Sequence, residues 1–183
     1  MKKNPLVAII MGSDSDIAVM ESSARLLERF KIPFEMKIVS AHRTPDEAAE
    51  YAKRLAERGI KVVIAGAGWA AHLAAAAAAQ SSLPVIGVPI DSSPLNGMDS
   101  LLSTAQMPPG VPVATMAIGK GGAYNAAIFA VRILSLLDPE LDIQHNLFRK
   151  QMAEEVISKN EDLQKNLAKE HPIKKPEEGS EMK

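Results

Sequence analysis

The sequence predicts an α/β fold in which helices cover both faces of a five-stranded parallel sheet. Two observations predict it: short apolar or alternating runs recur along the chain, and most of them are followed by a stretch with helical spacing of its apolar residues. Strands buried on both faces give unbroken apolar runs, and alternating strands and helices are typical of a parallel sheet. The predicted strands cover residues 6–11, 34–39, 62–65, 84–88 and 112–118, and the predicted helices cover residues 14–30, 45–58, 70–81 and 123–137.

The chain is long enough for one domain with an extension, because domains usually span about 100–200 residues. We expect an α/β catalytic domain over residues 1–138, a helical extension over residues 139–168 and a disordered tail over residues 169–183. Residues 89–110 form the longest irregular segment, and loops of that length in compact domains are usually functional. The extension carries apolar residues that could dock on the core or on another subunit: Leu147, Met152, Val156, Leu163 and Leu167.

The composition excludes several classes of protein. The formal net charge is -1, which leaves no electrostatic footprint for nucleic acid or an anionic membrane. The chain has no cysteine, which excludes disulfides, thiolate metal sites and thiol catalysis and is compatible with a reducing cytoplasm, where we expect the protein to reside. The apolar stretch over residues 62–79 approaches the length of a membrane span, but its glycines divide it into a strand and an alanine-rich helix. The apolar N-terminal run, which ends at Gly12 without a cleavage site, is better explained as a buried strand than as a signal peptide.

Polar segments follow the first four predicted strands. They are GSDSD at 12–16, SAHRTP at 40–45, GAG at 66–68, and the segment that begins at Pro89. Ligands of open parallel sheets bind outside the carboxyl ends of the strands. These four segments are therefore expected to converge on one pocket.

Each polar side chain in these segments suits a task. Ser13 and Ser15 stand where a helix begins, where free backbone N–H groups favour an anion. The guanidinium of Arg43 can grip a phosphate with two hydrogen bonds, and Asp16 can accept from ribose hydroxyls. His42 has the only side chain here whose ordinary pKa suits proton transfer near neutrality. The sequence thus predicts a cavity that binds a small phosphorylated substrate.

Simpler interpretations remain open for some of these residues. Serine and aspartate before a helix are commonly N-caps, and His72 can line the pocket or pack in a helix. Gly119-Lys120 lacks the other residues of a P-loop. Gly66 and Gly68 imitate a dinucleotide fingerprint, but they lie in the third unit and leave little chain for a substrate domain.

Seven blocks of sequence, taken in order, closely resemble the bacterial PurE family of N5-carboxyaminoimidazole ribonucleotide mutases. The blocks are MGSDSD (11–16), SAHRTP (40–45), IAGAGxAAHL (64–73), PVIGVP (84–89), LNGMDSLLS (95–103), QMPPGVPVAT (106–115) and the helix around Asn125. The resemblance covers roughly residues 5 to 137. It implies a flavodoxin-like three-layer α/β/α sandwich that assembles as an octamer with active sites at subunit contacts.

The resemblance also implies a reaction in purine biosynthesis that moves a carboxylate from the exocyclic nitrogen to C4 of an aminoimidazole ribonucleotide. It requires no metal and no cofactor. By this resemblance His42 is the proton shuttle. The residues expected to bind or surround the ribonucleotide are Ser13, Ser15, Asp16, Ser40, Arg43, Gly66, Gly68 and His72.

The PurE family contains two classes, and Arg43 bears on the choice between them. The sequence SAHRT resembles the mutase class, whereas the class that carboxylates aminoimidazole ribonucleotide with free CO2 typically has lysine after the histidine. The chain departs from the family at Trp69, where most members have glycine, and at residues 74–76, three alanines where members usually have Pro-Gly-Met. Both departures flank the predicted pocket loop.

Overall fold

The structure is a computed structural model that describes residues 4–170 of the chain. Its strands are β1 (Val7–Met11), β2 (Phe34–Ile38), β3 (Val62–Gly68), β4 (Val85–Ile90) and β5 (Ala114–Thr115). Its helices are the short 3-10 helix η1 (Asp14–Asp16), α1 (Ile17–Arg29), α2 (Pro45–Arg54), α3 (Leu73–Gln80), α4 (Met98–Ala105), α5 (Lys120–Ser135) and α6 (Pro139–Glu170).

The strands form one parallel sheet in the order β2-β1-β3-β4-β5. In β1, for example, Ile9 stands opposite Met36 of β2 and Ile64 of β3. Every residue of β1 and β4 is buried, which explains their unbroken apolar sequences. The prediction of a flavodoxin-like, five-stranded parallel sheet is confirmed, since this strand order is the flavodoxin-like one.

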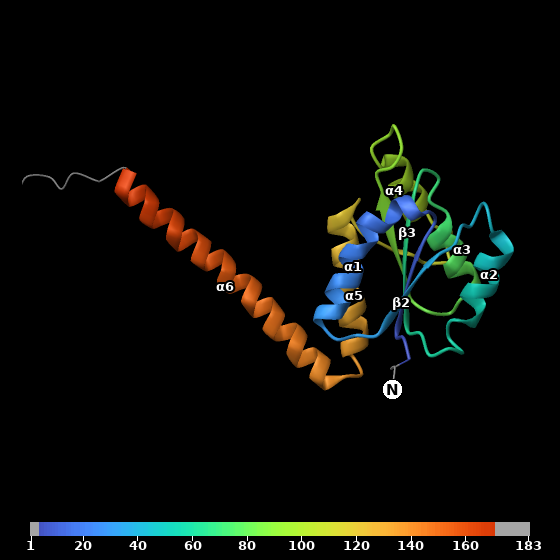
Figure 1. Ribbon diagram of the computed structural model, residues 1–183, viewed down its shortest axis with the longest axis horizontal. Helices are drawn as coiled ribbons and strands as arrows, with labels where there is room; N and C mark the ends of the chain where they lie inside the picture. Colours follow the sequence, from blue (N-terminus) through green and yellow to red (C-terminus); the bar gives the residue numbers. More distant parts are fainter. Residues whose placement is uncertain (1–3, 171–183) are drawn as a thin grey trace, which may run out of the picture. The chain divides into compact units, whose positions relative to one another are not determined.

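Helices cover the sheet on both faces (Figure 1). On one face α1 packs against α5, and the buried Ser23 hydroxyl of α1 donates a 2.5 Å hydrogen bond to the carbonyl of Ala123. Small residues on the buried side of α5 allow this close approach. On the other face α2 and α3 close a core built from Ile10, Val63 and Leu55. The layers leave the carboxyl ends of the strands open for a site.

Several elements differ from the sequence-based expectation, among them strand β5, which covers only Ala114–Thr115 of the expected 112–118. Helix α4 lies inside segment 89–110, which was expected to be irregular; it begins after Gly97, whose φ is +81°, and the Ser100 hydroxyl ties it to the Ile90 carbonyl at 3.0 Å. Helix α3 begins at Leu73 rather than at residue 70, because β3 continues to Gly68 and a tight turn follows. The polar, glycine-containing flanks of α4 concealed its short apolar face.

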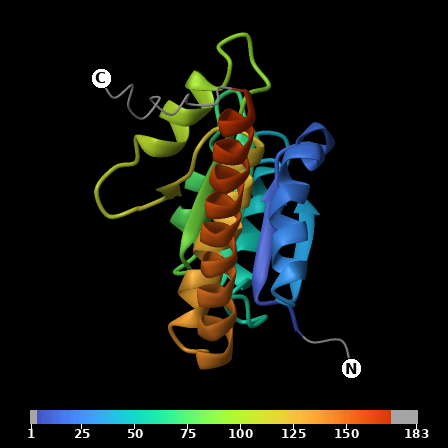
Figure 2. The same cartoon turned by 90° about the vertical axis from the view of Figure 1, so that its left-hand side faces the viewer.

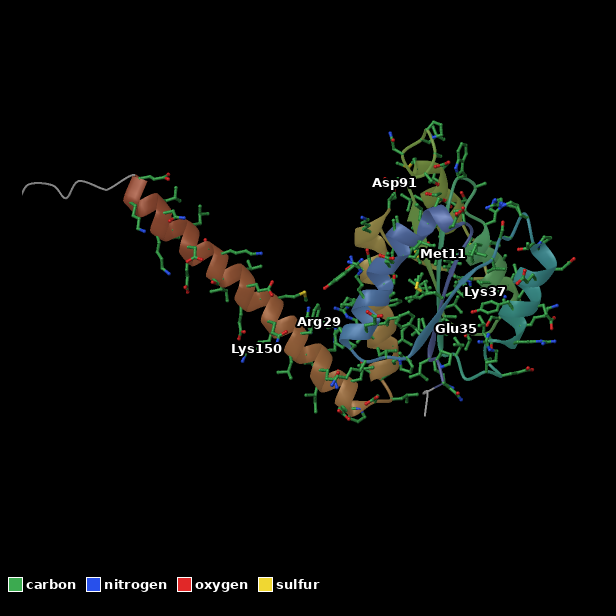
Figure 3. All side chains as sticks on the ribbon, in the orientation of Figure 1. Met11, Arg29, Glu35, Lys37, Asp91 and Lys150 are labelled. Atoms are coloured by element: carbon green, nitrogen blue, oxygen red, sulfur yellow. The ribbon has the colours of Figure 1, made fainter. Side chains whose placement is uncertain are left out.

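The edge strand β2 carries charged side chains that interact with α2 and the turn after it (Figure 3). Tyr51 donates a 2.5 Å hydrogen bond to Glu35, and Arg58 also pairs with Glu35. The Nζ of Lys37 lies 2.8 Å from Glu47 and 4.7 Å from the Tyr51 ring centre. Burial, with the Glu35 hydrogen bond and charge, raises the pKa of Tyr51. Charges of this kind discourage pairing of an exposed edge with another strand.

The chain divides into two compact units, Met1–Asp142 and Ile143–Lys183. Within the second unit α6 is one continuous helix to Glu170, coloured orange to red in Figure 2. It therefore extends two residues beyond the expected end of the extension, and residues 171–183 of the expected tail lie outside the described residues. The five apolar residues singled out on this helix are all exposed: Leu147, Met152, Val156, Leu163 and Leu167.

Candidate active site

A cavity of about 570 Å³ lies at the carboxyl ends of the strands, where the loops after β1, β2, β3 and β4 meet. This is the switch point of the sheet, because β2 lies on one side of β1 and β3 on the other. Its lining is mostly small or polar. The lining residues are Gly12, Ser13, Ser15, Asp16, Ser40, Ala41, His42, Arg43, Ala67, Gly68, Trp69, Ala70, His72, Leu73 and Ser92.

The loop after β1 brings three polar side chains to this cavity. Ser13 is the N-cap of η1 and accepts a hydrogen bond from the Ser15 backbone N–H at 3.4 Å. Its own hydroxyl donates to Asp14 at 2.9 Å. Ser13 therefore both caps the helix and lines the cavity, so the two interpretations of this residue are compatible.

Asp16 is the buried carboxylate of the site, with 4% of its surface exposed. Burial raises the pKa of Asp16 above its ordinary value, although hydrogen bonds with Ser13, Ser15 and Gly12 and the charge of Arg43 oppose the rise. Its carboxylate lacks a close salt-bridge partner within residues 4–170. A buried carboxylate without a salt-bridge partner is suited to accept hydrogen bonds from the hydroxyl groups of a ligand.

The loop after β2 is a compact turn that holds Arg43 against the first loop. The Thr44 N–H donates to the Ser40 carbonyl at 3.0 Å, and the Arg43 N–H donates to the Ser40 hydroxyl oxygen at 3.1 Å. The Arg43 guanidinium donates to the Gly12 carbonyl at 3.0 Å through Nη2. Since one guanidinium has five N–H donors, the remaining ones stay available for an anion beside Ser13.

His42 and His72 meet inside the cavity from different loops. His42 Nε2 lies 2.8 Å from His72 Nδ1, and the rings are arranged edge to face with centres 4.9 Å apart and planes at 73°. One ring must donate and the other accept, so the pair holds a proton between them. The open question about His72 is thereby answered: it lines the pocket rather than packing in a helix.

The loop after β3 is tightly held. A Cβ added to Gly68 would lie 1.8 Å from the Ser92 hydroxyl oxygen, so only glycine fits there. The next residue, Trp69, has a φ of +53° and leaves 59% of its surface exposed. This left-handed conformation costs a bulky residue roughly 1–2 kcal/mol relative to glycine. Beyond it, the Ala71 N–H donates to the Ser103 hydroxyl of α4 at 3.3 Å.

The structure brings together all of the expected site residues except Gly66. That glycine does not line the cavity; it pairs with Met11 inside β3, and a Cβ there would lie 2.3 Å from the Met20 sulfur. These neighbours give Gly66 a packing role inside β3, and its expected role in the site stays a prediction. Sequence reasoning missed Ser92 as a lining residue, although its position two residues after β4 follows the same strand-end rule.

Within residues 4–170, the histidine and carboxylate side chains form no group of three that could hold a metal ion. Among the same residues, no helix combines the length and apolar character needed to cross a membrane.

Comparison with known proteins agrees with this geometry. A family model described as AIR carboxylase matches residues 6–155. An N5-carboxyaminoimidazole ribonucleotide mutase of Pyrococcus horikoshii is 55% identical over 162 residues, which are 88% of this chain and 90% of that protein. A phosphoribosylaminoimidazole carboxylase of Candida albicans is 52% identical over 89% of this chain but only 28% of its own length. The crystal structure of Treponema denticola PurE superposes with a TM-score of 0.79 and 31% identity, covering 87% of this chain and 98% of that one. The chain belongs to the AIR carboxylase family, as its resemblance to PurE proteins predicted.

Proposed function

We propose that this protein is a mutase of purine biosynthesis that converts N5-carboxyaminoimidazole ribonucleotide into 4-carboxy-5-aminoimidazole ribonucleotide. The observation that carries the proposal is the His42–His72 contact in a cavity that also holds Arg43 and Ser13. It combines a proton-transfer group with an anion site, which is what this reaction requires. The close match to an archaeal mutase over 90% of that protein supports the same activity.

The substrate is held by its phosphate and its ribose. Arg43, fixed by its hydrogen bond to Gly12, directs its remaining donors to the phosphate, with Ser13 and Ser15 beside it. Asp16 accepts from the ribose hydroxyls, and its burial strengthens those hydrogen bonds. Ser40 acts indirectly, because its side chain is engaged by the Arg43 backbone.

The chemistry moves one carboxylate and one proton. The bond between the exocyclic nitrogen and the carboxyl carbon breaks, which releases CO2, and C4 of the ring then forms a bond to that CO2. The hydrogen on C4 leaves as a proton, and the former carbamate nitrogen gains one. We assign this transfer to His42, with His72 supporting it as the hydrogen-bond partner of His42.

The small residues of the cavity suit CO2, the intermediate that must stay bound until C4 reacts with it. Ala41, Ala67 and Ala70 line it and leave space for CO2 without offering polar groups that would hold water. Loss of the carbamate and recapture of CO2 can then occur in the same cavity.

A second candidate is carboxylation of aminoimidazole ribonucleotide with free CO2, the activity in the name of the Candida albicans relative. We favour the mutase because Arg43 follows His42 here, as in the mutase class. Turnover of each substrate without ATP, measured in one preparation, decides between them. Conversion of the carbamate at low bicarbonate supports the mutase, and turnover only of aminoimidazole ribonucleotide with bicarbonate overturns it. Binding of the ribonucleotide without any conversion would overturn both enzymatic proposals.

The octameric assembly, the lack of a cofactor and the cytoplasmic location belong to the same proposal. Large apolar side chains exposed on each unit support assembly, among them Leu95, Met98 and Leu102 in one unit and Val156 and Leu163 in the other. A molar mass measured by light scattering tests the octamer, and a monomer would contradict it.

A further inference from the structure

Trp69 stands out among the residues that line the cavity. It lies on the loop after β3, on the same short segment as His72. It is the only tryptophan in the chain, and the residues beside it on the cavity wall are Gly68 and Ala70. The indole is therefore the largest flat apolar surface that the chain offers to a ligand there.

The position of Trp69 in the structure is energetically unfavourable for a tryptophan. Its φ of +53° favours glycine, and 59% of its surface is exposed, so folding buries little of the indole. Tryptophan is thus a poor residue here for the stability of residues 4–170. Strained backbone that persists in a cavity points to a role in ligand binding.

The backbone on both sides of Trp69 contacts neighbouring elements. On one side Gly68 is pressed against Ser92, and on the other the Ala71 N–H donates to Ser103. Two residues beyond Ala70, His72 contacts His42. The backbone that carries the indole is therefore anchored three residues before His72, a member of the histidine pair.

We propose that Trp69 stacks on the planar heterocycle of the bound ribonucleotide and shields the reacting carboxylate from water. The inference rests on the proposed function, and adds to it a residue that recognises the base. Indoles stack readily on nitrogen heterocycles, whereas the phosphate and ribose contacts of Arg43, Ser13 and Asp16 do not read the base at all. Trp69 would therefore contribute the base-specific part of recognition and would act as a positioning residue.

Because the chain has a single tryptophan, its fluorescence reports on this residue alone. The wild-type protein is titrated with 5-aminoimidazole ribonucleotide and, separately, with ribose 5-phosphate, which lacks the ring. The expected result is a change in indole emission with the ribonucleotide and none with ribose 5-phosphate, even though ribose 5-phosphate competes for the site. Equal changes with both ligands, or no change at saturating ribonucleotide, would overturn stacking.

Kinetics of two variants provide the second test. Trp69→Phe keeps an aromatic ring and is expected to retain KM within about threefold. Trp69→Gly is expected to raise KM about tenfold, which is about 1.4 kcal/mol, with a smaller change in kcat. It is also expected to melt no lower than the wild type, since glycine suits the local φ. A KM for Trp69→Gly within twofold of the wild type overturns the proposal.

The outcomes separate this inference from the proposed function. If the wild type turns over neither substrate, the proposed function fails, and the fluorescence titration still tests stacking. If the wild type is active but its emission depends on protein concentration and not on the ribonucleotide, the indole is covered by a second copy of the chain. That result also overturns stacking.

Discussion

His42 Nε2 lies 2.8 Å from His72 Nδ1, although the two residues are 30 positions apart in the sequence. One nitrogen of each ring takes part in this contact, and the other nitrogen remains available to a substrate or to solvent. The contact fixes the ring planes relative to each other, because one ring must donate the hydrogen bond and the other must accept it. The two histidines should therefore differ in what their loss does to catalysis.

We predict that His42→Asn folds and assembles normally and loses about 10²–10⁴ in kcat, the usual contribution of a general acid–base group. The matched variant His72→Asn keeps a polar partner for His42 and should lose about tenfold. Steady-state kinetics on the carbamate substrate measure both effects. A His42→Asn enzyme within tenfold of the wild type would contradict the proton-shuttle role of His42, and equal losses in the two variants would show that the rings act as a unit.

The second prediction concerns Arg43, whose guanidinium bonds to the Gly12 carbonyl at 3.0 Å. In Arg43→Lys a single ammonium group cannot hold that carbonyl and also grip a phosphate with a planar fork. KM for the ribonucleotide should rise at least tenfold. Arg25→Lys is the control, because Arg25 pairs with Glu21 on the exposed side of α1 and does not line the cavity. It should leave KM unchanged, and a similar rise in both variants would point to a general effect of replacing a guanidinium by an ammonium group instead.

Much of this arrangement follows from the sequence. Apolar runs such as residues 6–11 identified the central strands, and the strand-end rule placed His42, Arg43 and Ser13 at one edge of the sheet. The contact between His42 and His72 could not be predicted, because it depends on how far β3 extends and how tightly the next loop turns. The sequence showed that Trp69 was unusual, but not that its backbone adopts a left-handed conformation.

Two departures from the sequence-based expectation have physical reasons as well. Helix α4 was hidden because its apolar positions are interrupted by polar residues that bond back to the backbone, as Ser100 does to Ile90. Gly66 was expected in the site because it belongs to the GAG segment at the end of its strand, within a block that resembles the PurE family. Here the close approach comes from the Met20 side chain on the core side of the strand. The sequence alone does not show whether such a glycine makes room for a ligand or for a side chain of the core.

The third prediction uses the buried carboxylate of Asp16. Because burial raises its pKa in the folded protein, the ionised form is less favourable folded than unfolded. Asp16 therefore lowers stability as pH rises from its ordinary value through its raised one, and the effect is absent in acid, where the group is protonated in both states. Asp16→Asn should melt higher than the wild type at neutral pH and approach it at low pH.

The same Asp16→Asn substitution should raise KM for the ribonucleotide about tenfold or more, because hydrogen bonds to a charged acceptor contribute about 1.5–3 kcal/mol. Thermal unfolding at several pH values, combined with kinetics, measures both effects. The control is Asp46→Asn in the exposed first turn of α2, where the lost carboxylate favoured the helix N-terminus, so its melting temperature should not rise. An Asp16→Asn protein that melts lower at neutral pH would contradict the assignment.

The last prediction tests the packing role of Gly66. In Gly66→Ala the new Cβ would lie 2.3 Å from the sulfur of Met20, whose side chain is fully buried and has little room to move. The free energy of unfolding should fall by about 1–3 kcal/mol, the usual cost of overpacking a core, while KM stays within about twofold of the wild type. Gly121→Ala is the matched control, because a Cβ at that helical glycine has no neighbour within 4 Å among the described residues and should leave stability unchanged or raise it by up to about 1 kcal/mol. Chemical denaturation and steady-state kinetics separate the two roles of Gly66: unchanged stability with a raised KM would return this residue to the active site.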